Sequence, residues 1–240
     1  MSERLTNTAN SPERMAPGAA LHVEVIADLI CPFCYLGKRR LGTALRAVQG
    51  PYDVSWLPWQ LNPEMPPEGQ SFDEYLTRRF GSPASVEPVL EGLAREGKEA
   101  GIAFRFDRLT RVPNTMKAHQ LMYLAERDGR NQSELAEELM SAYFESGEDI
   151  GDSSVLIERS RRHGIAADDV LRVIDDEAAR QIITTREGQV RSSGIAGVPG
   201  FLLNRRLLMI GAQEADAMVN AFDRAMFGEG TDELVSPALH

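Results

Sequence analysis

The order of hydrophobic and polar positions changes character twice along the chain. Residues 21–28 (LHVEVIAD) and 52–60 (YDVSWLPWQ) are rich in β-branched or aromatic residues and roughly alternate, which is typical of strands. Between them, residues 34–48 place apolar side chains on one face of a helix. Pro58 cannot donate a hydrogen bond within a sheet, so it confines the second strand to a sheet edge or a strand end.

A long helical block follows the second strand. Nearly every segment from Ser71 to about Ser192 has apolar residues at helical spacing. Two stripes are the clearest, and they consist of Ala118, Leu121, Met122 and Ala125, and of Leu135, Leu139, Ala142 and Tyr143.

The strand pattern returns after the helical block. The apolar runs 201–203 and 207–210 predict a hairpin, although the turn between them, at Asn204-Arg205, lacks a glycine. An amphipathic helix over 214–227 follows. The order is strand, helix, strand, helical block, strand, strand and helix, which predicts a small α/β unit that carries a helical insertion.

The predicted domain organisation has five segments. They are a disordered tail at 1–20, the first part of the α/β domain at 21–62, an inserted helical domain at 63–185, the second part of the α/β domain at 186–228 and a flexible tail at 229–240. The first tail is rich in Ser, Pro, Asn and Ala and has no apolar stretch that could serve as a secretory signal. The expected compartment is therefore the cytoplasm.

The charge of the chain narrows the classes of partner. The net charge is -10 and the pI is about 5.0, which disfavours a nucleic-acid or anionic-membrane surface. No apolar run approaches the roughly 20 residues that span a bilayer. Proteins and small molecules stay open as partners, and a homodimer is left open as the assembly.

Both cysteines of the chain lie in the sequence Cys31-Pro32-Phe33-Cys34, where the first strand gives way to a helix. A helix N-terminus stabilises a thiolate, so Cys31 is expected to be exposed, ionised and nucleophilic. Pro32 suits the first helical turn. Cys34 lies one turn further on the apolar face, so we expect it to be buried and to resolve the mixed disulfide.

Two other interpretations of the cysteine pair stay open. Zinc usually needs four ligands, and the chain has neither a second cysteine pair nor a matching histidine pair, so no metal site is predicted. Two inert buried thiols are the second alternative, because free cysteine is often core. In the cytoplasm, however, a cysteine pair seldom serves as a structural disulfide, which favours redox chemistry.

Val198-Pro199 precedes the apolar run of the hairpin. Pro199 is either an ordinary trans proline that opens a strand or a cis proline close to the cysteine turn. In the second case the backbone of Val198 is free to pair with an extended substrate.

The chain resembles the DsbA-like thioredoxin-fold family, and within it the FrnE-like branch, which is related to kappa-class glutathione transferases and 2-hydroxychromene-2-carboxylate isomerases. The resemblance covers about residues 21–228. The motifs that carry it are DLICPFCYLGK (28–38), PWQLNP (58–63), PNTxxAH (113–119) and GVPGF with GAQ (197–213). It implies a four-stranded mixed thioredoxin sheet with a large all-helical insertion, a redox pair at Cys31 and Cys34, and a cis proline at Pro199.

The same resemblance sets the expected function. It implies a protein-disulfide oxidoreductase or isomerase with no tightly bound cofactor, for which glutathione is a candidate co-substrate. The expected partners are thiol or disulfide substrates, either proteins or small molecules. A glutathione-dependent isomerase or transferase that acts on a small organic molecule is the alternative. Those relatives typically have serine at the position of Cys31, so a cysteine there favours dithiol chemistry. A non-catalytic interaction protein is a third hypothesis.

Several other side chains are candidates for the substrate site. Phe33 and Met65 are expected at an apolar rim, with Met65 as an exposed lid. His119 and Asn114 are candidate substrate contacts, with a structural histidine and a helix cap as their alternatives. Asp28 either accepts a proton from Cys34 or turns the chain before the motif, because the acid that related proteins bury six residues before the first cysteine is replaced here by Val25.

Overall fold

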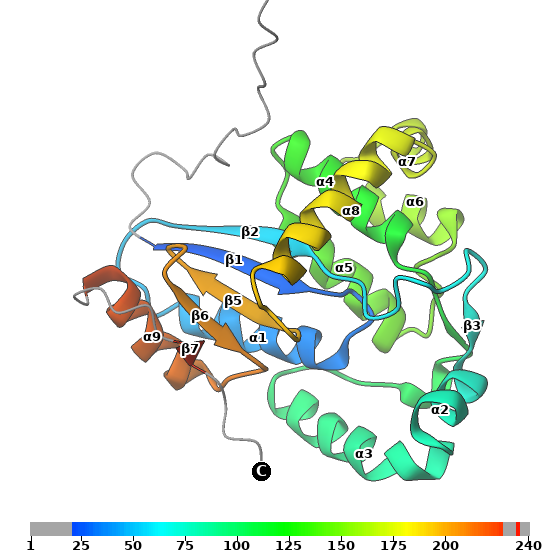
Figure 1. Cartoon of the computed structure of the whole chain (residues 1–240), viewed down its shortest axis with the longest axis horizontal. Coiled ribbons are helices and arrows are strands. Elements are labelled where there is room, and N and C mark those ends of the chain that lie inside the picture. Colours follow the sequence, from blue (N-terminus) through cyan, green and yellow to red (C-terminus); the bar gives the residue numbers. More distant parts are fainter. Residues whose placement is uncertain (1–20, 228–233, 236–240) are drawn as a thin grey trace, which may run out of the picture.

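The computed structural model describes residues 21–227 and 234–235. Its main sheet has the strand order β2-β1-β5-β6-β7 (Figure 1). The strands are β1 (Leu21–Ala27), β2 (Tyr52–Pro58), β5 (Gly200–Leu203), β6 (Leu207–Ile210) and β7 (Leu234–Val235). β2 lies parallel to β1 at one edge, as Pro58 predicts, and β5 runs antiparallel to both β1 and β6. The two-residue strand β7 adds a parallel partner beyond the four predicted strands.

The insertion lies between β2 and β5. Its helices are α2 (Phe72–Phe80), α3 (Pro83–Glu99), α4 (Met116–Arg127), α5 (Gln132–Phe144), α6 (Ser153–Arg161), α7 (Ala167–Ile174) and α8 (Glu177–Ser192). The prediction of an all-helical insertion needs one correction, since β3 (Gln70–Ser71) and β4 (Arg111–Val112) pair in a small antiparallel sheet. That pairing closes the segment that carries α2, α3 and the short 3-10 helix η1 (Phe106–Arg108).

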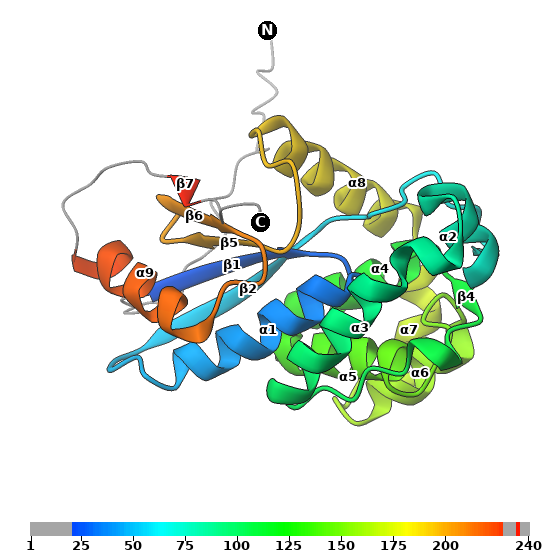
Figure 2. The same cartoon turned by 90° about the horizontal axis from the view of Figure 1, so that it is seen from below.

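Helices cover both faces of the main sheet. α1 (Pro32–Leu45) and α9 (Ala215–Phe227) lie on one face and α8 on the other (Figure 2). Val25 packs in the large core with α1, whereas Ile26, on the opposite face of the strand, packs with Val190 of α8. All seven residues of β1 are therefore buried. Both predicted helical stripes are buried as well, in α4 and α5.

The predicted hairpin forms between β5 and β6 without a glycine. The turn passes through Asn204 and Arg205, whose φ angles are 49° and 54°. This region normally favours glycine, but asparagine tolerates it. The Asn204 amide also accepts a hydrogen bond from the His22 N–H at 2.7 Å and donates one to the Ala225 carbonyl at 3.1 Å. These contacts hold the turn against β1 and α9.

The segment boundaries differ in part from the predicted ones. α8 continues to Ser192, so the boundary predicted at 185 falls inside a helix. The tails predicted at 1–20 and 229–240 lie outside the described residues, except for Leu234–Val235. No helix of the described part is long and apolar enough to cross a membrane.

Position 37 of α1 has no room for a side chain. A Cβ on Gly37 would lie 3.0 Å from Phe201 Cζ and 3.1 Å from Pro199 Cγ, whereas a Cβ on Gly42 of the same helix would meet nothing within 4 Å. We expect Gly37→Leu to lower the free energy of unfolding by about 1–3 kcal/mol, because overpacking displaces buried groups. Gly42→Leu, the matched control, should raise it by up to about 1 kcal/mol through helix propensity. Urea unfolding measures both, and equal effects would contradict the close approach.

Candidate active site

The cysteine turn lies where β1 leads into α1. Cys31 is the N-cap of α1 with an extended backbone (φ −92°, ψ 115°), and Pro32 occupies the first turn, as predicted. The Cys31 carbonyl accepts hydrogen bonds from the N–H groups of Cys34 and Tyr35 at 3.0 and 3.1 Å. The positive end of the helix dipole therefore lies beside the Cys31 thiol. No acidic residue in the first turn opposes it.

The prediction that Cys31 is exposed is wrong. The residue keeps only 4% of its surface, and Cys34 keeps 1%. Cys31 belongs to the large core cluster, which joins side chains of the α/β unit and of the insertion, and the pattern along the chain does not predict this packing. The thiol is nevertheless reached from a pocket, since Cys31 is among the pocket's lining residues.

The pocket at Cys31 has a volume of about 380 Å³. Its walls come from the cysteine turn, from the loop before β5 and from the insertion. The lining residues are Ile30, Cys31, Pro32, Phe33, Leu61, Phe72, Tyr75, Leu76, Arg79, Phe80, Ser85, Val86, Val89, Leu90, Leu93, Phe106, Leu109, Val112, Tyr143, Phe144 and Val198. The volume lies in the range of small-molecule sites, which is about 300–1,000 Å³.

Cys34 lies one helical turn beyond Cys31, beneath the pocket. Burial raises the pKa of the Cys34 thiol well above its ordinary value, and a hydrogen bond with the Cys31 side chain raises it further. The two cysteine side chains are therefore neighbours, and the Cys34 thiol resists ionisation. The predicted asymmetry is confirmed for Cys34, which is buried and hard to ionise.

A buried acid lies next to Cys34. Asp28 is fully buried, and its charge acts on the Cys34 thiol. One carboxylate oxygen of Asp28 accepts a hydrogen bond from the Leu61 N–H at 2.7 Å. The other lies 3.4 Å from Nε2 of His119 in α4. Neither of these two atoms has a hydrogen-bond partner within the described residues.

His119 does not line the Cys31 pocket, which corrects its predicted role as a substrate contact. It lines a separate crevice of about 20 Å³, together with Trp56, Glu126 and Arg186 among others. A cavity needs about 10–15 Å³ to hold one water molecule, so this crevice has room for one. His119 therefore connects buried Asp28 to a small crevice on the far side of the cysteine turn.

The loop before β5 supplies the second wall of the site. The Val198–Pro199 peptide bond is cis, as the resemblance implies. Val198 lines the same pocket as Cys31, and Pro199 lies against α1 at Gly37. Within the described residues the Val198 backbone makes no hydrogen bond to other backbone groups, so the prediction of a free N–H and C=O beside Cys31 remains consistent with the structure.

Two other predicted site residues lie elsewhere. Asn114 is not in the pocket; its amide donates a hydrogen bond to the Met65 carbonyl at 2.5 Å and accepts one from the Met116 N–H at 2.9 Å. It therefore ties the loop of Met65 to the start of α4, but it is not the helix cap that its alternative interpretation proposes, because the N-cap of α4 is Thr115. Met65 is 5% exposed, so it is not an exposed lid. Phe33, in contrast, is 43% exposed and lies on the rim of the pocket.

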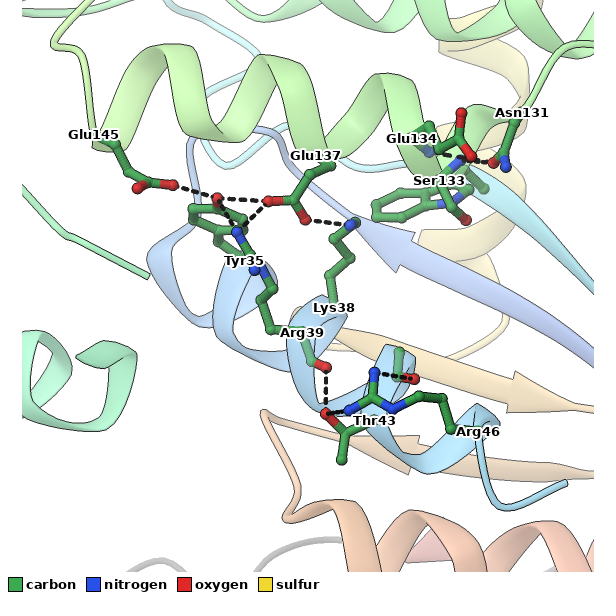
Figure 3. Close-up of polar contacts among 12 residues, drawn as sticks. Tyr35, Lys38, Arg39, Thr43, Arg46, Asn131, Ser133, Glu134, Glu137 and Glu145 are labelled. Carbon is green, nitrogen blue, oxygen red and sulfur yellow. Dashed lines mark hydrogen bonds and ion pairs between the residues drawn. The ribbon is translucent and has the colours of Figure 1, made fainter. Parts of the chain in front are cut away.

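Charged side chains tie the helix of the cysteine turn to the insertion. The Tyr35 hydroxyl lies 2.7 Å from Glu137 and 2.6 Å from Glu145 of the insertion (Figure 3). Lys38 pairs with Glu137, and Arg39 contacts the same carboxylate at 2.6 Å. Although burial raises the pKa of Glu137, these cations, Lys38 above all, bring it below its ordinary value. The network fixes α1 against α5.

Tyr35→Phe tests this network. The substitution keeps the buried ring but leaves two part-buried carboxylates without the hydroxyl, so we expect the free energy of unfolding to fall by about 1–3 kcal/mol. Tyr52→Phe is the matched control, because Tyr52 is 48% exposed. Urea unfolding gives both values. A Tyr35→Phe protein as stable as the control would show that the network contributes nothing to stability.

The residues that sequence reasoning missed come from the insertion. The pocket wall of α2 and α3 and the contact between Asp28 and His119 join segments that are far apart in the chain. The apolar residues of α3 at helical spacing indicate a face that packs against something, but not that it faces Cys31. Within the described residues no group of three or more His, Cys, Asp or Glu side chains is arranged to hold a metal ion.

Comparisons with known proteins agree with this geometry. The model of the DSBA-like thioredoxin domain matches residues 22–223. A curated relative, "Uncharacterized protein YwbO" of Bacillus subtilis (strain 168), is 23% identical over 145 residues, which are 60% of this chain and 67% of that protein.

Two solved structures extend the comparison. A "probable DsbA oxidoreductase" from Streptomyces coelicolor is 27% identical, with a TM-score of 0.78 over 90% of this chain and 94% of that one. A 2-hydroxychromene-2-carboxylate isomerase is 14% identical, with a TM-score of 0.66 over 85% and 95% of the two chains, and at that identity it supports the fold alone. The predicted fold class, a thioredoxin-like α/β fold with a helical insertion, is confirmed.

Proposed function

The chain belongs to the DSBA-like thioredoxin domain family, and on this premise we propose that it is a thiol-disulfide oxidoreductase in which Cys31 and Cys34 exchange disulfides with a thiol or disulfide substrate. One observation carries the proposal. Cys31 caps α1 on the wall of an open pocket, and the buried Cys34 follows one helical turn later, where the Cys31 side chain acts on its thiol. A nucleophile and a resolving thiol need this arrangement.

The two thiols of the protein supply both electrons that the reduction of a substrate disulfide needs. The Cys31 thiolate attacks one sulfur of a substrate disulfide, and the other substrate sulfur leaves as a thiolate. The Cys34 thiolate then attacks the Cys31 sulfur, which forms the Cys31–Cys34 disulfide and releases the second substrate thiolate. The substrate gains two electrons and the cysteine pair loses them. The reverse sequence oxidises a substrate dithiol.

The second step needs a proton acceptor for Cys34, because burial raises the pKa of that thiol. Asp28 is the buried carboxylate beside it, and His119 joins Asp28 to a crevice large enough for one water. We assign to Asp28 the role of taking the Cys34 proton, with His119 holding the carboxylate in place. Asp28 would thus replace the buried acid that related proteins carry six residues before the first cysteine, where this chain has Val25.

The isomerase or transferase alternative has less support. Its solved relative shares the fold, but a cysteine stands at position 31 of this chain. The lining of the pocket also fits glutathione poorly, since that tripeptide carries carboxylates and an ammonium group, and Arg79 is the only charged residue among the lining residues. Membership of the FrnE-like branch stays a prediction.

A stoichiometric reaction tests the proposal. When one equivalent of 4,4′-dithiodipyridine is added to the reduced protein, we expect both thiopyridone halves to be released and the Cys31–Cys34 disulfide to form. Absorbance follows the release, and intact mass spectrometry detects adducts. Cys31→Ser should abolish the fast release. A stable adduct on Cys34, or a folded wild-type protein that does not react, would show that the two thiols do not act as a pair.

A further inference from the structure

The rim of the Cys31 pocket is mainly apolar and open to solvent, with Arg79 and Ser85 as its exposed polar residues. Phe33, Phe80 and Val89 are among the large hydrophobic residues that stay exposed, at 43%, 46% and 49%, and all three line this pocket. They come from three separate segments, namely the cysteine turn, the end of α2 and the middle of α3. Exposed apolar side chains that gather around one pocket mark a binding site for an apolar ligand.

The interior of the pocket has the same character. Leu76, Val86, Leu93 and Phe144 are buried members of its wall. The Tyr143 hydroxyl is already engaged, since it donates a hydrogen bond to the Arg111 carbonyl at 3.1 Å. A ligand that carries several charges would lose its hydration in this pocket without gaining matching partners.

The depth of Cys31 limits the size of the substrate. The residue is 4% exposed and lines a pocket whose other walls include α2 and α3, so a reacting disulfide has to enter the pocket to reach the sulfur. A volume of about 380 Å³ holds a molecule with one or two aromatic rings. A disulfide on the surface of a folded protein is attached to a bulky chain on both sides, which the walls of α2 and α3 oppose.

From these observations we infer that the pocket selects an uncharged aromatic disulfide, or the corresponding thiol, of low molecular weight, in preference to glutathione or a protein. The inference rests on the proposed exchange chemistry at Cys31 and names its substrate class. The rings would lie among the apolar residues of α2 and α3, with the disulfide toward Cys31. Arg79 is the only charged lining residue, so no other lining side chain could form an ion pair with a charged substituent of the ligand.

Binding is measured apart from chemistry in the double variant Cys31→Ser, Cys34→Ser, which keeps the pocket and cannot exchange disulfides. Diphenyl disulfide is the probe, and titration calorimetry gives its Kd. We expect saturable binding of the probe. Adding Val89→Asp to the double variant should raise the Kd about tenfold, because the new carboxylate then lies beside the apolar ligand. Leu171→Asp is the matched control, since Leu171 is 43% exposed in α7 and is not a pocket residue. It should leave the Kd unchanged.

Competition decides between substrate classes. We expect oxidised glutathione and insulin with its disulfides intact to leave the Kd of diphenyl disulfide unchanged, even when each competitor is present at a concentration well above that Kd. Absence of probe binding, equal loss in the Val89 and Leu171 variants, or displacement by either competitor would overturn the inference. Because this double variant carries no thiols, none of these results bears on the exchange chemistry, which the wild-type reaction with dithiodipyridine tests separately.

Discussion

Cys34→Ser will stop the exchange after its first step and leave half of the substrate bound to Cys31. In the wild-type protein the resolving thiol lies one helical turn beyond Cys31 in the same chain, so the second step is intramolecular. Intramolecular reactions of well-placed groups reach effective concentrations of about 10⁵ M or more, so losing the thiol should slow release of the second half by at least about 10³-fold. Serine keeps the size of the side chain and removes the nucleophile.

One equivalent of 4,4′-dithiodipyridine distinguishes the two proteins. We expect the Cys34→Ser protein to release one thiopyridone at the wild-type rate and to retain the other as an adduct, which peptide mass spectrometry places on Cys31. Added dithiothreitol should then release the retained half. If the variant instead releases both halves as quickly as the wild type, Cys34 is not the resolving thiol and the assigned roles are wrong.

Asp28→Asn will slow the second step by about 10²-fold and leave the first step unchanged, because general base catalysis typically contributes about 10²–10⁴-fold. The substitution is nearly isosteric. An asparagine oxygen can still accept the hydrogen bond from the Leu61 N–H, while the amide nitrogen replaces the oxygen that faces His119. The fold should therefore survive, and the change acts on proton transfer from Cys34.

The pH profile separates proton transfer from a purely electrostatic effect. The charged or titratable groups that act on Cys34 are Cys31 and Asp28, and the charge of Asp28 raises the pKa of Cys34. If Asp28 acted through its charge alone, Asp28→Asn would lower that pKa and speed the second step at neutral pH. We expect the opposite, a slower second step that recovers as the pH rises and the Cys34 thiol ionises without help. His119→Gln serves as a second variant and should have a smaller effect of the same sign.

The sequence is most informative where local rules determine the structure. The strand before Cys31, the helix after it, the edge position imposed by Pro58 and the hairpin at Asn204-Arg205 all follow from spacing and backbone preferences. The paired thiols were identified from their place at a strand-to-helix junction. Each of these features depends on residues close together in the chain.

The features that sequence reasoning missed depend on tertiary contacts. Cys31 is buried in a core that also takes in side chains of the inserted helices, forty or more residues later. His119 meets Asp28 across 91 positions, and a helical histidine gives no indication of which buried acid it will face. Met65 lies in a Pro-rich loop that suggests exposure, yet its backbone is tied down by Asn114. The local sequence pattern specifies the helices and strands, but it does not specify which of their faces pack against one another.

The central claim is that Cys31 and Cys34 form one reversible redox pair, and equilibration with buffers of 2-mercaptoethanol and its disulfide, which are small and uncharged, tests it most directly. After equilibration the reaction is quenched, free thiols are alkylated and the mass of the intact protein is measured. We expect both thiols to disappear together as the buffer becomes more oxidising, in proportion to the ratio expected for a two-electron couple and with no mercaptoethanol adduct at equilibrium. Cysteines that form separate adducts with mercaptoethanol, or a Cys31 that stays alkylatable when Cys34 is oxidised, would contradict the claim.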